Sequence, residues 1–146
     1  MTKNTKSLLL VIVQLLSIAY LFFSGPLIPT DIIILLVFIA GVFLGVWALY
    51  AFRGTRFSVL PEIPENAALV TAGPYRIIRH PIYTSILLIT GALLINEPSP
   101  LRLIVFIVLL AVLLIKTQIE ETYLDHHFKE YGNYKAQTQK LIPFLY

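Results

Sequence analysis

Cysteine is absent from this 146-residue chain, and charged residues make up only 13% of it. Without cysteine the chain has no disulfide framework, zinc–thiolate site, iron–sulfur cluster or thiol nucleophile. Soluble domains carry about 25% charged residues, so the low charge and the 58% apolar content argue against a disordered or ordinary water-soluble chain. The net charge of +3 does not indicate a nucleic-acid partner, and none is predicted. The length suits a single domain covering residues 1–146.

Four apolar segments predict an all-α integral membrane protein. They cover residues 7–28, 31–52, 81–96 and 101–119. A transmembrane helix needs about 20 apolar residues, and lipid offers backbone amides no partner outside the helix itself. The third segment is short, and Arg102 and Lys116, near the ends of the fourth, are expected to snorkel. A cleaved signal peptide is the alternative for the first segment, but its apolar run is long and three more segments follow.

The basic residues indicate the orientation. In a four-span arrangement ten of the eleven fall on one side, and only Arg102 falls on the other. This positive-inside bias predicts cytoplasmic termini in a plasma (inner) membrane. Gly41 and Gly45 allow close helix packing, either within the bundle or between protomers. No charged residue lies deep inside a span, which argues against a channel or pump.

Polar residues with possible chemistry precede the third span or lie in its first turn, on the predicted cytoplasmic face. Gly73-Pro74 predicts a turn, and Pro81 is well placed to begin the helix. Arginines beside a helix N-terminus suit a small anionic or zwitterionic ligand. The same residue types are also common as membrane-surface anchors and interfacial aromatics. The cluster comprises Tyr75, Arg76, Arg79, His80 and Tyr83.

An acidic pair, Glu120 and Glu121, follows the fourth span directly. Two adjacent carboxylates at this depth need a cation, and either the arginine-containing loop or a positively charged ligand would supply it. Further on, Leu124, Phe128 and Tyr131 have the spacing of a cytoplasmic amphipathic helix along the membrane surface.

Nucleotide-binding and metal-binding motifs are missing from the sequence. It contains no GxGxxG, Walker or GxSxG motif, which excludes the conventional nucleotide folds. His126 and His127 are adjacent, and neighbouring side chains on a helix point apart, so they would chelate a metal poorly. No metal site is predicted.

Taken in chain order, the motifs resemble the isoprenylcysteine carboxyl methyltransferase family. The resemblance rests on the L-V-T-x-G-P-Y-R-x-x-R-H-P-x-Y run of residues 69–83, on Glu120-Glu121-x-x-Leu124 and on Ile142-Pro143. Members of this family are multispan membrane enzymes that use S-adenosylmethionine, and phospholipid N-methyltransferases share much of the signature. The resemblance implies a methyltransferase whose partners are membrane lipids and a lipophilic small molecule or lipid as substrate.

The resemblance also implies roles for individual residues. It places Lys116 where eukaryotic members have a substrate-binding arginine, and lysine lacks the bidentate grip of arginine on a carboxylate. Arg79 suits the carboxylate of the cofactor. His80, Lys116 and Glu121 are the predicted catalytic residues, with His80 or Glu121 as the base if the acceptor is an amine. Cofactor contacts are implied for Ala67, Ala68, Leu69, Val70, Tyr75, His80, Pro81, Ile82, Tyr83 and Glu120.

The predicted function is methylation of an isoprenylcysteine carboxylate or another small lipophilic carboxylate. Three alternatives stay open: a phospholipid N-methyltransferase, a sterol-reductase-like enzyme that uses NADPH, and a membrane protein without enzymatic activity. A reductase would need additional basic residues for the cofactor phosphate and a larger bundle. The predicted function requires Tyr83 and Glu120 to lie together at one membrane face.

Overall fold

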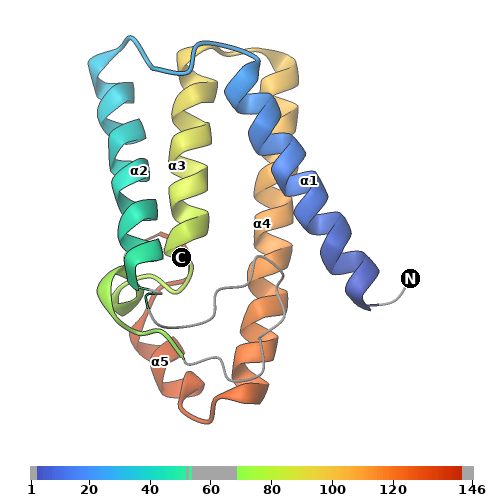
Figure 1. The fold of residues 1–146 in the computed structure, drawn as a ribbon, viewed down its shortest axis with the longest axis vertical. Coiled ribbons are helices and arrows are strands. Elements are labelled where there is room, and N and C mark those ends of the chain that lie inside the picture. The colour runs from blue at the N-terminus through green and yellow to red at the C-terminus, as the bar shows by residue number, and fades with distance from the viewer. Residues whose placement is uncertain (1–2, 52, 54–68, 143–146) are drawn as a thin grey trace.

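The computed structural model describes residues 3–51, 53 and 69–142, which form a helical bundle (Figure 1). Within these residues the backbone is helical apart from its connections and one isolated β-bridge. The predicted all-α fold is therefore confirmed. The elements are α1 (Lys3–Phe23), α2 (Ile32–Ala51), the 3₁₀ helix η1 (Gly73–Arg76), α3 (Pro81–Asn96), α4 (Pro100–His127) and α5 (Tyr131–Gln137).

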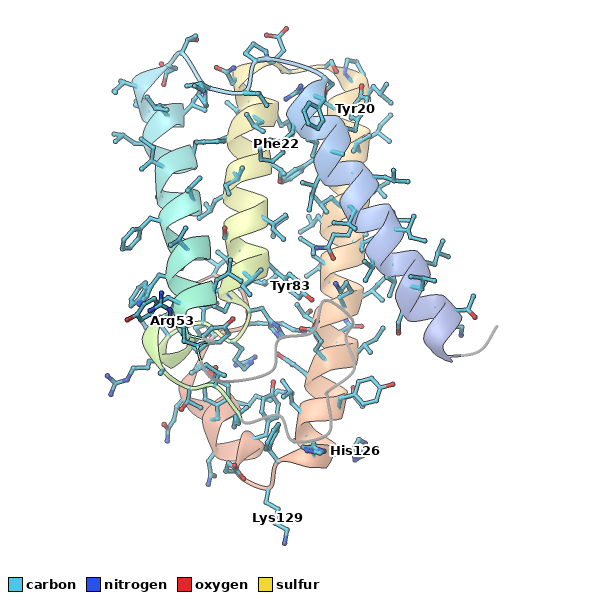
Figure 2. The ribbon with its side chains drawn as sticks, in the orientation of Figure 1. Tyr20, Phe22, Arg53, Tyr83, His126 and Lys129 are labelled. Carbon is cyan, nitrogen blue, oxygen red and sulfur yellow. The ribbon has the colours of Figure 1, made fainter. Side chains whose placement is uncertain are left out.

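The two ends of the bundle differ in composition. The connections 24–31 and 97–99 lie at one end, while η1, α5 and the last turns of α4 form the other (Figure 1). Figure 2 places Arg53, His126 and Lys129 toward this second end and Tyr20 and Phe22 toward the first. We call the second end the polar end. Its cytoplasmic orientation stays a prediction.

The bundle exposes apolar side chains along its length, as expected of a protein surrounded by lipid. In α2 only Gly41 and Ala48 are buried, while Phe43 is 66% and Val46 63% exposed. Three helices, α1, α2 and α4, are long and apolar enough to cross a membrane, and α3 is a shorter apolar helix of 16 residues. The chain is therefore an integral membrane protein.

Two of the four predicted segments match the observed helices to within one residue, whereas the first differs at both ends and the fourth at its C-terminal end. The first helix begins at Lys3 instead of residue 7. It ends at Phe23 instead of residue 28, since Gly25 and Pro26 follow and proline provides no amide hydrogen for the helix. The fourth helix continues past residue 119 to His127. The single amphipathic helix predicted through Leu124 and Tyr131 is interrupted at Phe128, between α4 and α5.

Close packing of α2 on α3 depends on the two glycines of α2. A β-carbon on Gly41 would lie 2.9 Å from Ile89 Cγ1, and one on Gly45 would lie 2.5 Å from Ser85 Oγ. The Ser85 hydroxyl donates to Gly41 O at 2.7 Å. The small residues thus serve packing within the bundle, which was one of the two predicted uses.

Arg102 closes the end of the bundle opposite the polar end. Its side chain does not snorkel to water as predicted, because the residue is only 2% exposed. Nη1 donates to Ser24 Oγ at 2.7 Å, and Nη2 donates to Leu93 O at 2.6 Å. The guanidinium therefore joins the ends of α1 and α3 to the start of α4.

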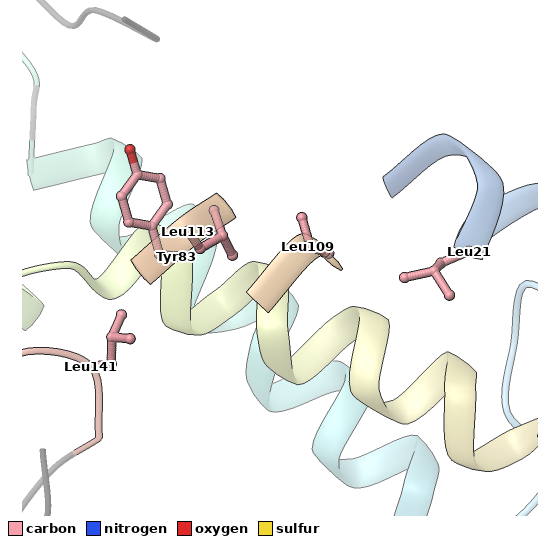
Figure 3. Close-up of a cluster of buried hydrophobic side chains, with 5 residues drawn as sticks. All are labelled: Leu21, Tyr83, Leu109, Leu113 and Leu141. Carbon is pink, nitrogen blue, oxygen red and sulfur yellow. The ribbon is translucent and has the colours of Figure 1, made fainter. Parts of the chain in front are cut away.

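The buried core extends between α1, α3, α4 and the segment that follows α5. Its members are four leucines and one tyrosine: Leu21, Tyr83, Leu109, Leu113 and Leu141 (Figure 3). The Tyr83 ring packs among these apolar residues, whereas its hydroxyl points away from them (Figure 3). The core thereby fixes the ring and directs its one polar atom toward the polar end.

Candidate functional site

A turn and a proline determine where the polar loop enters α3. Gly73 begins η1 with φ of +59°, a conformation that residues with a β-carbon rarely adopt. A β-carbon there would also lie 3.2 Å from Trp47 Nε1. Pro81 is the first residue of α3, where its missing amide hydrogen costs nothing. Both predictions for this loop are confirmed.

The segment after α5 is hydrogen-bonded to the loop before α3. Ile78 and Gln139 form a parallel β-bridge. The Arg79 amide donates to Gln139 O at 2.8 Å, and the His80 amide donates to Lys140 O at 3.1 Å. These bonds hold the side chains of Arg79 and His80 between α5 and the end of α4.

His80 lies between the two glutamates. Its Nδ1 is 3.3 Å from Glu120 Oε2, and its Nε2 is 3.3 Å from Glu121 Oε1. The His80 side chain is 5% exposed. An imidazole that donates from both nitrogens is protonated, so this arrangement suits an imidazolium between two carboxylates.

The pKa of His80 follows from its surroundings. Burial by itself lowers this pKa, but the hydrogen bonds and negative charges of Glu120 and Glu121 outweigh burial, and the pKa is raised above its ordinary value of 6.5. The two carboxylates therefore favour the protonated form of His80, whose positive charge offsets part of the acidic pair.

Tyr83 connects this cluster to α3. Its hydroxyl donates to Glu120 Oε1, and its ring stacks on the His80 ring at a centroid distance of 5.7 Å. The two residues that the predicted function requires at one membrane face are thus in direct contact. Figure 2 shows Tyr83 projecting from the half of α3 nearer the polar end.

Glu121 is surrounded by positive charge. Arg79 Nε donates to its Oε1 at 2.9 Å, and the ammonium groups of Lys135 and Lys140 lie 3.5 and 3.9 Å from its Oε2. Because these cations and His80 stabilise the carboxylate, Glu121 is poorly suited to accept a proton. Its predicted role as a base is therefore less well supported than a role in holding the cluster together.

Arg79 also holds the C-terminal segment. Its Nη1 donates to Lys135 O at 3.1 Å and to Thr138 O. The guanidinium therefore has protein partners on two sides in addition to Glu121. Its predicted contact with a cofactor carboxylate stays a prediction.

Lys116 is buried instead of snorkelling to the surface as predicted. It is 1% exposed, and its Nζ donates to Gln14 Oε1 of α1 at 2.7 Å. The same Nζ lies 5.2 Å from the centre of the Tyr83 ring. Gln14 was not predicted as a site residue, although an amide within an apolar span was a visible signal.

Tyrosines from η1 and α5 complete the site. The Tyr134 hydroxyl donates to Tyr75 O at 2.8 Å. Burial raises the pKa of Tyr75, and the neighbouring Tyr134 and Glu120 raise it further, so its phenol stays protonated. The buried Tyr131 hydroxyl has no hydrogen-bond partner among the residues that the structure describes. These phenols can donate hydrogen bonds but do not act as bases at neutral pH.

The other predicted cofactor residues lie near the site or fall outside the residues that the structure describes. Leu69 and Val70 are half-buried in the segment before η1. Ile82 packs against the core, and Pro81 is buried at the start of α3. Ala67 and Ala68 fall outside the described residues. The structure thus joins the histidine, the tyrosines, the lysine and the acidic pair in one cluster.

Comparison with known proteins adds one match. A family model described as phospholipid methyltransferase matches residues 30–131. This is more than half of the 146 residues and includes α2, η1, α3 and α4, whereas α1 precedes the matched range. A search of curated proteins found no match.

Proposed function

Because the chain belongs to the phospholipid methyltransferase family, we propose that it methylates a lipophilic acceptor with S-adenosylmethionine at the polar end of the bundle. The prediction of a membrane methyltransferase is confirmed at the level of this family. The narrower assignment to isoprenylcysteine carboxyl methyltransferases stays a prediction. The observation that carries the proposal is the contact of His80 and Tyr83 with Glu120.

The chemistry of the cluster fits the cofactor. S-Adenosylmethionine has a carboxylate, an ammonium and ribose hydroxyls, and its sulfonium supplies the methyl group. Glu120 suits the ammonium or ribose, since its side chain is 22% exposed against 9% for Glu121. Arg79, Lys135 and Lys140 provide positive charge for the carboxylate.

Tyr75, Tyr83 and His80 suit the apolar part of such a ligand. Tyr83 is held by the core on one side and by His80 and Glu120 on the other. Its ring is therefore rigid and can align a ligand beside it. In methyl transfer most of the rate comes from alignment and from exclusion of water, and a buried, ordered ring contributes to both.

We propose a carboxylate as the acceptor group, of the isoprenylcysteine type or another small lipophilic acid. A carboxylate oxygen needs no base when it accepts a methyl group, and the cations around Glu121 make that residue a poor base. Lys116, in the predicted position of a substrate-binding arginine, provides a positive charge in the apolar interior.

A phospholipid amine is the second candidate acceptor, and the family match favours it. An amine loses a proton when it is methylated, so this reaction requires a proton acceptor. Glu120 is better suited than Glu121, because fewer cations contact it. An amine acceptor therefore requires Glu120 as a proton acceptor, whereas a carboxylate acceptor does not.

Binding to purified protein in detergent tests the proposal. We expect S-adenosylmethionine and S-adenosylhomocysteine, but not NADPH, to give a calorimetric binding signal. Glu120→Gln, which removes the charge but keeps the shape, should weaken the binding of both sulfur ligands by about tenfold or more, the usual cost of a lost charged hydrogen bond. Glu130→Gln is the matched control at an exposed glutamate and should bind like the wild type.

Two results would contradict the proposed function. One is a wild type that binds neither S-adenosylmethionine nor S-adenosylhomocysteine. The other is an NADPH signal in their place, which would favour the reductase alternative. Transfer of a labelled methyl group into lipid extracts then identifies whether an ester or a methylated amine forms.

A further inference from the structure

Helix α1 presents a polar face to the bundle. Ser7, Gln14 and Ser17 are each no more than 7% exposed in a helix that is otherwise mostly apolar. Together with buried Leu21 they follow the spacing of one helix face. Burying polar side chains in a membrane span is costly unless they have partners, so this face serves an interaction inside the bundle.

Gln14 connects α1 to the site. Its Oε1 accepts the 2.7 Å hydrogen bond from Lys116 Nζ, which lies over the Tyr83 ring. Tyr83 in turn donates to Glu120. A continuous chain of contacts thus runs from α1 to the acidic pair, although α1 lies outside the residues that the family model matches.

We propose that Gln14 is a positioning residue that directs the Lys116 ammonium toward the anionic head of the acceptor, so that α1 selects the acceptor. A neutral amide orients an ammonium without cancelling its charge, whereas a carboxylate would neutralise it. The acceptor is accordingly a lipophile with an anionic oxygen near the methylated atom. This inference rests on the proposed function.

Two kinds of lipid share this chemistry. In a fatty or prenylated acid the carboxylate is itself the methylated group, and in an aminophospholipid the phosphate is the anion beside a methylated amine. A simple alkylamine has no anion and serves as the comparison. Oleate, dioleoylphosphatidylethanolamine and oleylamine therefore distinguish the two sources from a purely apolar preference.

Binding of these three lipids to protein saturated with S-adenosylhomocysteine tests the inference without turnover. Gln14→Leu should weaken the binding of at least one anionic lipid by about tenfold, since a hydrogen bond to a charged group contributes about 1.5–3 kcal/mol. Gln14→Glu should weaken the same lipid at least as much, because it neutralises Lys116 while keeping the contact. Oleylamine binding should not weaken in either variant, because a cationic head group gains nothing from the positive charge of Lys116.

Ser17→Ala is the matched control, since it removes a buried polar group from the same face of α1. It should bind all three lipids like the wild type. The inference is wrong if Gln14→Glu leaves the binding of both anionic lipids unchanged. It is also wrong if the Gln14 variants weaken the binding of oleylamine and S-adenosylhomocysteine as much as that of the anionic lipids, which would indicate a purely structural role. A wild type that does not bind S-adenosylhomocysteine would instead contradict the proposed function.

Discussion

His80 is the residue at which burial and charge compete most directly in this protein. Burial disfavours its cation, but Glu120 and Glu121 contact its two nitrogens and favour it. The result is an ion cluster in which one imidazolium joins the acidic end of α4 to the start of α3. Its strength depends on protonation and hence on pH.

The pH dependence of stability tests this arrangement. Because the pKa of His80 is raised above 6.5 on folding, the folded state holds the proton more tightly than the unfolded state. The resulting stabilisation is complete below pH 6.5 and is lost as the pH rises through the raised pKa. We expect the difference in melting temperature between wild type and His80→Gln to be largest at or below pH 6.5 and to narrow on the alkaline side.

His126→Gln provides the control for this measurement, because His126 is exposed at the end of α4. Its melting temperature should follow that of the wild type across the same pH range. A His80→Gln difference that stays constant, or that grows toward alkaline pH, would show that the imidazolium does not stabilise the fold.

At the scale of the elements, the pair α2 and α3 shows how small residues replace a conventional core. Lipid provides little hydrophobic drive for helices to associate, so close backbone contact and polar bonds between helices contribute instead. Gly41 supplies both, since it allows Ile89 to approach closely and its carbonyl oxygen accepts a hydrogen bond from the Ser85 hydroxyl. This packing keeps α3, and with it Tyr83, in place.

Gly41→Ala should therefore destabilise the bundle. Its β-carbon would lie 3.1 Å from the Ile89 amide nitrogen, a backbone atom that cannot move aside easily, so we expect the free energy of unfolding to fall by about 1–3 kcal/mol. Thermal unfolding in detergent measures the change. Gly132→Ala, where nothing lies within 4 Å of the added carbon, should leave the melting temperature unchanged or slightly higher, and equal losses in the two variants would contradict the packing role of Gly41.

At the scale of the whole molecule, one end of the bundle contributes to stability and the polar end carries the candidate site. Arg102 joins three helices at one end, while the ionisable cluster around His80 lies at the other. The apolar lengths of α1, α2 and α4 lie between them. Changes at the Arg102 end should therefore alter stability and leave ligand binding intact.

Arg102→Lys tests this separation. A lysine keeps the charge but cannot reach Ser24 and Leu93 with two separate nitrogens, so we expect the free energy of unfolding to fall by about 2 kcal/mol. The affinity for S-adenosylhomocysteine should stay at the wild-type value. Arg76→Lys, at an exposed arginine, should change stability by less than about 0.5 kcal/mol, and a large loss of ligand affinity in Arg102→Lys would show that the two ends are coupled.

Apolar runs and helix-start signals, read from the sequence, determined the helical fold, the bounds of α2 and α3 and the presence of a polar cluster at one end. These features depend on composition and on residues close together in the chain, which a linear sequence contains in full. The continuation of α4 to His127 was missed because hydropathy reports the membrane boundary, whereas a helix ends only where its hydrogen bonding ends.

Only the tertiary structure decided the partners of Arg102 and Lys116. Both were expected to extend toward water, yet each meets a polar side chain of the α1 region, Ser24 or Gln14, that is distant in the sequence. Which side chains face one another depends on how each helix is rotated and placed against its neighbours. That choice is made by packing over the whole bundle, so no local pattern in the chain records it.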